Sequence, residues 1–153
     1  MNRIELSEAL PSGLYLIRSE SDTVFVLRFQ RPPTGWSIGV SQVRRIRGRS
    51  SRTRLSFDGW WLPLISVAPA GTPDGERWPS RIEVGSRPLW VHVADPRRWS
   101  METAWILQRE VVSIEPIGYE QMRQLGAERG LVLPPWSPGQ DRLIYDGEVD
   151  RDC

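Results

Sequence analysis

Arginine is the residue type whose placement in this chain suggests a chemical role. Between Thr23 and Phe57 the sequence has eight arginines and no acidic residue, and six of these arginines lie within residues 44–54. The formal net charge of the whole chain is only +1, so the positive charge is a local feature. A guanidinium donates several hydrogen bonds in one plane to carboxylates and phosphates, and it also stacks on aromatic rings. The segment therefore predicts contact with an anionic partner.

We expect this segment to form a β-hairpin. Trp36–Arg47 is predicted to be its first strand, Gly48–Ser51 its polar tip and Arg52–Phe57 its returning strand. An antiparallel ribbon of this kind can carry a row of arginines along one edge. Two adjacent tryptophans follow the hairpin and offer surfaces on which nucleic-acid bases can stack. The predicted partner-binding residues are Arg44, Arg45, Arg47, Arg49, Arg52, Arg54, Trp60 and Trp61.

Three interpretations of the arginine hairpin stay open. Nucleic acid is one possible partner, because arginines neutralise phosphates. An acidic protein surface or a neighbouring subunit is another, through its carboxylates. The third interpretation is structural: charged side chains on an exposed strand edge oppose aggregation, or they pair with the acidic C-terminal residues. Because Arg45, Arg47 and Arg49 lie near the polar tip, their joint replacement by serine is predicted to leave the fold intact.

The residues that usually carry catalysis or bind metals are scarce. His92 is the only histidine, and the only cysteine is Cys153 at the last position. A zinc site needs several cysteine or histidine ligands. We therefore expect a non-enzymatic protein with no catalytic residue, no bound metal and no cofactor.

The elements around the hairpin are predicted to be short strands separated by glycine and proline. Further strands are expected at Gly13–Ser19, Thr23–Gln30, Trp60–Val67, Arg81–Val84, Pro88–Ala94 and within Thr103–Ile114. Pro63 interrupts its strand or places it at an edge, because proline cannot donate to a ladder. The pair Asp95-Pro96 is typical of the start of a short helix. One longer helix is expected at Gly118–Arg129, from its apolar spacing and the glycine that follows.

These elements predict a mainly β fold: a partly open barrel or sandwich of short antiparallel strands with one C-terminal helix. We expect a single domain over residues 1–138, which includes the helix 118–129, and an acidic, mobile tail over 139–153. The sequence has no apolar leader at its N-terminus and no window approaching the ~20 apolar residues that span a bilayer. A soluble, cytoplasmic protein without membrane contact is therefore expected.

Composition, charge and motifs together favour a non-enzymatic small β-barrel binding module. It is expected to present its arginine-rich hairpin to nucleic acid or to an acidic protein surface. The alternative is a structural or assembly subunit of a multiprotein complex, such as a phage particle. In that case the arginines and the proline-rich loops make protein–protein contacts.

Overall fold

The computed structural model describes residues 1–31, 41–97, 102–132 and 144–145. Its elements are β1 (Arg3–Glu5), β2 (Gly13–Ser19), β3 (Val24–Phe29), β4 (Gln42–Ile46), β5 (Leu62–Pro69), the 3-10 helix η1 (Asp74–Glu76), β6 (Arg81–Glu83), β7 (Pro88–Val93), β8 (Thr103–Leu107), β9 (Val111–Ile117), α1 (Tyr119–Glu128), β10 (Leu131–Val132) and β11 (Ile144–Tyr145). The predicted mainly β composition with a single C-terminal helix is confirmed for the described residues.

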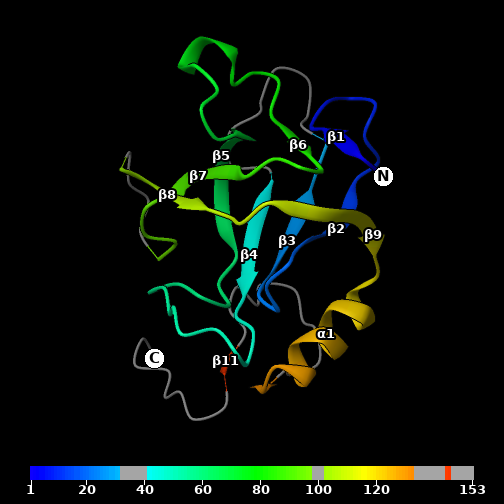
Figure 1. Cartoon of the computed structure of the whole chain (residues 1–153), viewed down its shortest axis with the longest axis vertical. Coiled ribbons are helices and arrows are strands. Elements are labelled where there is room, and N and C mark those ends of the chain that lie inside the picture. Colours follow the sequence, from blue (N-terminus) through cyan, green and yellow to red (C-terminus); the bar gives the residue numbers. More distant parts are fainter. Residues whose placement is uncertain (32–40, 98–101, 133–143, 146–153) are drawn as a thin grey trace.

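Seven antiparallel strands form the main sheet, in the order β8-β7-β5-β4-β3-β2-β9. Strands β8 and β9 are its two edges, although they follow each other in the chain and are joined only by residues 108–110. In Figure 1 this joined segment crosses in front of β3 and β4. Among the described residues β8 does not pair with β9, so the sheet is not closed, in agreement with the predicted partly open barrel or sandwich of antiparallel strands.

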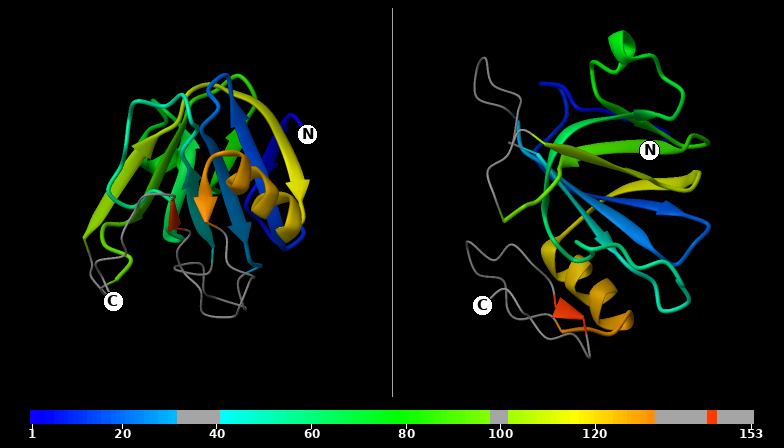
Figure 2. Two further views of the ribbon diagram at one scale, coloured as in Figure 1. Left: turned by 90° about the horizontal axis from the view of Figure 1, so that it is seen from below. Right: turned by 90° about the vertical axis from the view of Figure 1, so that its left-hand side faces the viewer.

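Both faces of the sheet are covered, which explains why β2 and β3 are apolar on both sides. One face packs into the main core, which contains Ile17, Phe25 and Trp90. The other face carries Leu16, Val24 and Val26 of the sheet, in one cluster with Met122 of α1. Figure 2 shows α1 lying across this outer face. Since successive side chains of a strand point to opposite faces, a strand covered on both sides must be apolar throughout.

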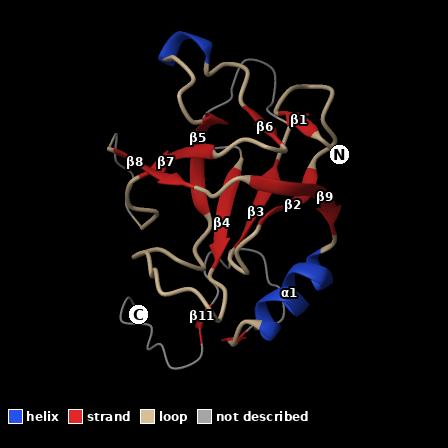
Figure 3. Cartoon of the chain, viewed as in Figure 1, coloured by secondary structure: helices blue, strands red, loops and turns tan. Residues whose placement is uncertain are grey.

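A second, two-stranded sheet joins β1 to β6 with Ile4 opposite Ile82. Both isoleucines are buried in the main core. In Figure 3 these two strands lie at the same end of the molecule as the long loop that contains η1. The small sheet therefore contributes apolar surface to the same core and not a separate one.

The bend between β8 and β9 is held by one buried polar side chain, that of Gln108, which is 2% exposed. The indole N–H of Trp90 donates to Gln108 Oε1 at 3.0 Å, and Gln108 Nε2 donates to the carbonyl of Ile17 at 3.1 Å. Trp90 in turn stacks on Phe25, with 5.7 Å between ring centroids. One glutamine thus ties β7 to β2 through the inside of the sheet.

The predicted hairpin is only half right. Residues 42–46 form strand β4 as expected, but Arg52–Phe57 is not a strand. Instead, residues 47–61 form a loop between β4 and β5, called here the β4–β5 loop. The part of the predicted first strand that precedes residue 41 lies outside the described residues. The loop replaces a strand because its backbone folds around a buried ion pair, described below.

Other boundaries also differ from prediction. The β-rich segment Thr103–Ile114 contains two strands, because the chain bends at the polar residues 108–110, and the second strand continues to Ile117. Strand β5 contains Pro63 but is not an edge, since it pairs with both β4 and β7; a register shift between Leu64 and Ser66 does interrupt it. No helix forms over residues 95–97, where the Arg97 N–H donates to Asp95 Oδ1 in a turn.

The expected tail is described at two residues, Ile144 and Tyr145, which pair with Leu131–Val132. The remainder of 139–153 lies outside the described residues. Across the ranges that the structure describes, no helix combines the length and the apolar character that crossing a membrane requires.

Candidate anion-binding cavity

The two adjacent arginines of β4 point to opposite faces of the sheet, as strand geometry requires. Arg44 is 2% exposed and its guanidinium lies 4.1 Å from the ring centroid of Trp61, which is itself 5% exposed. Trp61 belongs to the cluster beneath α1. Burial strengthens such a cation–π contact, because water no longer competes for the cation. Arg44 and Trp61, both predicted to face a partner, are therefore interior residues.

Arg45 lies on the inner face and is also buried. Its Nη1 atom donates to both carboxylate oxygens of Asp58, at 2.6 and 2.5 Å, and its Nη2 atom donates to the carbonyl of Thr53 at 3.3 Å. Asp58 Oδ2 accepts a further hydrogen bond from the Leu55 N–H at 3.0 Å. The β4–β5 loop thus wraps around this ion pair. The expectation that Arg45 is an exposed, replaceable tip residue is wrong, because its charge organises the loop.

The tip of the loop is fastened to the β2–β3 turn and to the end of α1. Asp22 accepts hydrogen bonds from the Ser50 N–H at 3.0 Å and the Ser50 hydroxyl at 2.7 Å, and these bonds lower the pKa of the Asp22 carboxyl. Arg49 Nε donates to the carbonyl of Glu128 at 2.6 Å. A side chain at Gly48 would clash with the Asp22 carboxylate, so only glycine allows this close approach.

The remaining predicted residues lie nearer the surface. Arg47 is half-buried, whereas Arg52 and Arg54 are exposed. Trp60 is half-buried and makes an edge-to-face contact with Phe57, with 5.8 Å between ring centroids. The structure therefore does not gather the six arginines and two tryptophans into one surface. It distributes them between the core, the helix C-terminus and the β4–β5 loop.

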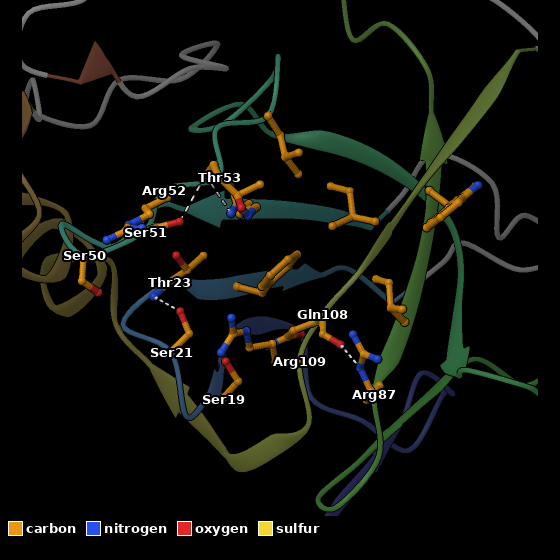
Figure 4. Close-up of a pocket in the computed structure, with 16 residues that line it drawn as sticks. Ser19, Ser21, Thr23, Ser50, Ser51, Arg52, Thr53, Arg87, Gln108 and Arg109 are labelled. Carbon is orange, nitrogen blue, oxygen red and sulfur yellow. Dashed lines mark hydrogen bonds between the residues drawn. The ribbon is translucent and has the colours of Figure 1, made fainter.

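A cavity of about 640 Å³ lies between the β4–β5 loop and strand β8. It brings Arg45 and Arg52 together with two arginines that sequence reasoning missed, Arg87 before β7 and Arg109 after β8. Figure 4 shows Arg52 on the side of the loop and Arg87 and Arg109 on the side of β7 and β8. None of the described residues that line the cavity is an aspartate or a glutamate. The cavity is therefore a cationic site built from segments far apart in the sequence.

Three of these arginines are unlike Arg45. In the described part of the chain, no carboxylate forms a salt bridge with Arg52, Arg87 or Arg109. Arg87 Nε does donate to the Gln108 carbonyl at 3.4 Å, which turns its side chain toward the bend. All three residues are exposed. Their charge is thus available to an incoming anion.

Hydroxyl groups and one exposed tryptophan complete the lining. The hydroxyl residues come from the β2–β3 turn and from the β4–β5 loop: Ser19, Ser21, Thr23, Ser50, Ser51 and Thr53. Hydroxyls both donate and accept hydrogen bonds, so they suit anionic oxygens as well as backbone groups. On the β8 side, Trp105 lines the cavity and is 66% exposed. This combination of cations, hydroxyls and an aromatic rim is suited to binding.

The described residues that line this cavity include no histidine, cysteine or carboxylate side chain. His92 does not line it; the ring is buried, with Nδ1 at 2.7 Å from the carbonyl of Val93. Burial lowers the pKa of His92, because the charged ring loses its hydration. Among the residues that the structure describes, no cluster of three histidine, cysteine, aspartate or glutamate side chains is placed to hold a metal ion.

Only a weak sequence signal pointed to the missed residues. Trp105 and Arg109 fall in the β-rich segment Thr103–Ile114, and the polar run Gln108–Glu110 inside it marked the bend. Arg87 follows the Gly85-Ser86 turn, a position that carries no pattern of its own. Comparison of the chain with protein-family models, curated proteins and solved structures finds no significant match. The chemistry of the cavity is therefore the basis on which a function can be proposed.

Proposed function

We propose that this protein is a non-enzymatic binding module that takes an anionic partner into the cavity between the β4–β5 loop and β8. The observation that carries the proposal is the convergence of Arg52, Arg87 and Arg109 on a cavity whose described lining contains no acidic residue. Like charges placed together repel one another, and a bound anion relieves that repulsion. This favours the sequence-level hypothesis of an anionic partner, but with the cavity in place of a hairpin.

Two features support binding as opposed to a purely solubilising role for these arginines. The cavity volume of about 640 Å³ is within the range of ~300–1,000 Å³ that ligand sites occupy. The side chain of Trp105 is exposed at its rim, where it can cover a bound group. Large exposed aromatics are enriched where proteins contact partners.

The proposal is tested by charge-matched variants. The triple variant Arg52→Ser, Arg87→Ser, Arg109→Ser removes the cavity charge. The control Arg3→Ser, Arg77→Ser, Arg123→Ser removes equal charge from arginines that lie outside the cavity, each beside a carboxylate. Binding of fluorescent poly-glutamate and of a fluorescent single-stranded oligonucleotide is measured by anisotropy at low salt. We expect the cavity variant to lose about tenfold or more in affinity for whichever polymer binds, and the control to lose about twofold at most.

Equal losses in the two triple variants would contradict the proposal, because net charge and not the cavity would then govern binding. Absence of binding to either polymer by the wild-type protein would contradict it as well.

The alternative, a structural or assembly subunit, is favoured by a separate observation. Trp78 is 55% exposed in the loop between η1 and β6 and does not line the cavity. An exposed tryptophan in a loop suits a protein–protein anchor. Light scattering of the purified protein distinguishes the two roles, because a subunit of this kind associates with itself or with its neighbours without any added anion.

A further inference from the structure

The cavity runs along the edge of β8 and not along one of its faces. Five consecutive residues, 105–109, line it. A strand that offered one face to a cavity would contribute only every second side chain, because side chains alternate between faces. Consecutive lining residues are instead expected where a cavity borders the backbone edge of a strand. The free edge of the main sheet and the cationic cavity therefore coincide.

The alternation of hydrogen-bonded and non-bonded residues along β8 identifies which of its backbone groups face that edge. The Gln108 N–H donates to the Pro88 carbonyl at 3.0 Å, and the Ala94 N–H donates to the Glu102 carbonyl at 2.9 Å. In an antiparallel ladder, hydrogen-bonded pairs alternate with non-bonded pairs. From the register of β7 and β8, Ala104 and Ile106 then bond to β7. The N–H and C=O groups of Trp105 and Leu107 consequently point the other way, toward the cavity.

No partner in the described chain takes up these outward groups: neither the ladder with β7 nor any other described hydrogen bond uses the outward edge at Trp105 and Leu107. Natural proteins usually protect such an edge with charges, proline or a covering segment. Strand β9, the opposite edge, contains Glu115 and Pro116. Strand β8 has neither a charge nor a proline, and its Trp105 side chain is exposed. The two edges are thus unlike, and no described strand pairs with the outer edge of β8.

We infer that the partner is an extended acidic polypeptide segment that adds to the free edge of β8 as an eighth strand. This inference rests on the proposed function and specifies its partner. Backbone donors and acceptors in strand register match another polypeptide backbone, which is the basis of recognition by strand addition. Carboxylates on the added segment then meet Arg52, Arg87 and Arg109, and Trp105 covers a neighbouring side chain across the new strand pair.

The inference is tested with a capped peptide of about eight alternating valines and glutamates, a length that covers β8 with a short overhang. Its control replaces every glutamate by glutamine. The protein variant is Leu107→Pro, which removes the outward N–H but no bond to β7, and proline is tolerated at strand edges. The matched variant Leu107→Ala trims the side chain and keeps the N–H.

We expect the acidic peptide to bind, and the glutamine peptide to bind at least about tenfold more weakly, because it lacks charge-assisted contacts. Leu107→Pro is expected to weaken binding by about tenfold, while Leu107→Ala weakens it by about threefold at most. Thermal unfolding of both variants verifies that they are folded. Equal affinity of the proline and alanine variants would overturn strand addition, although the arginine dependence of the proposed function would still stand.

A measurement on the wild-type protein removes any dependence on the variants. Amide hydrogen exchange followed by NMR is expected to show fast exchange at Trp105 and Leu107 in the free protein and slow exchange at Ala104 and Ile106. Adding the acidic peptide should slow exchange at Trp105 and Leu107. Unchanged exchange at saturating peptide would overturn the inference. Binding of the oligonucleotide in place of the peptide would also overturn it, while leaving an anion-binding cavity in place.

Discussion

At the residue scale, burial and not charge separates the arginines of the 44–54 segment. Arg44 and Arg45 have the same chemistry and adjacent positions, yet one lies against Trp61 beneath the helix and the other binds Asp58 inside the sheet. Arg52, seven residues further on, is exposed in the cavity. The first two stabilise the fold, because a buried guanidinium must keep its partners. Only the third is placed to meet a partner outside the chain.

Arg45→Met is therefore expected to destabilise the protein by about 3–5 kcal/mol, since it leaves the Asp58 carboxylate buried without its cation. The measurement is the free energy of unfolding in urea. The matched control Arg52→Met removes an exposed arginine of the same loop and is expected to stay within about 0.5 kcal/mol of wild type. In the double variant Arg45→Met, Asp58→Leu the loss should be smaller than the sum of the single losses. A cost below about 1 kcal/mol for Arg45→Met would show that the ion pair is not structural.

His92 makes stability depend on pH. Its pKa in the folded protein is lowered from 6.5 because burial disfavours the charged ring. Below pH 6.5 the unfolded chain therefore takes up a proton that the folded protein resists. The contribution of the uncharged His92 ring to the free energy of unfolding is fully present above pH 6.5. It is lost as the pH falls from 6.5 toward the lower pKa of the folded state.

The variant His92→Gln should remove this part of the pH dependence of the free energy of unfolding. Between pH 7 and pH 5, the free energy of unfolding is expected to fall more steeply for the wild type than for the variant, as measured in urea at several pH values. Parallel pH profiles would mean that His92 titrates alike in both states.

At the scale of elements, the β4–β5 loop is as well anchored as a strand, although it has no ladder. The Arg45–Asp58 pair holds its middle, and Asp22 holds its tip through Ser50. Arg49 fastens it to the carbonyl of Glu128 at the end of α1. A loop fixed at three places presents a defined wall to the cavity. Preorganisation of this kind lowers the entropy lost on binding.

The bend between β8 and β9 depends on Gln108 in the same way. In Gln108→Leu the indole N–H of Trp90 and the carbonyl of Ile17 lose their partners while remaining buried. We expect a loss of about 2–5 kcal/mol in the free energy of unfolding, from two unsatisfied buried groups. The control Gln124→Leu, on the exposed side of α1, should change stability by about 0.5 kcal/mol at most. A shift of the Trp90 indole resonance in Gln108→Leu but not in the control would locate the effect, and an unchanged unfolding curve would contradict it.

At the scale of the whole molecule, the open edges of the main sheet and the cationic cavity have one origin. The segment β8–β9 supplies both edges of the sheet, so it must cross from one to the other. The chain leaves a gap where β8 passes the β4–β5 loop, and Arg45, Arg52, Arg87 and Arg109 line that gap. Because the net charge is only +1, long-range attraction is weak, and the proposed anionic partner would have to be recognised at short range.

The sequence by itself determined the strand-rich class, because alternation, β-branched residues and glycine and proline punctuation act locally. Gly13–Ser19 matches its prediction, and the helix matches to within one residue at each end. It also showed where arginines are concentrated along the chain. Which of them are buried and which line the cavity was decided only by the tertiary structure. Asp58 captures Arg45, Trp61 covers Arg44, and the sheet topology brings Arg87 and Arg109 beside Arg52. Contacts between residues so far apart in the chain produce no periodic pattern in the sequence, so no local pattern could predict them.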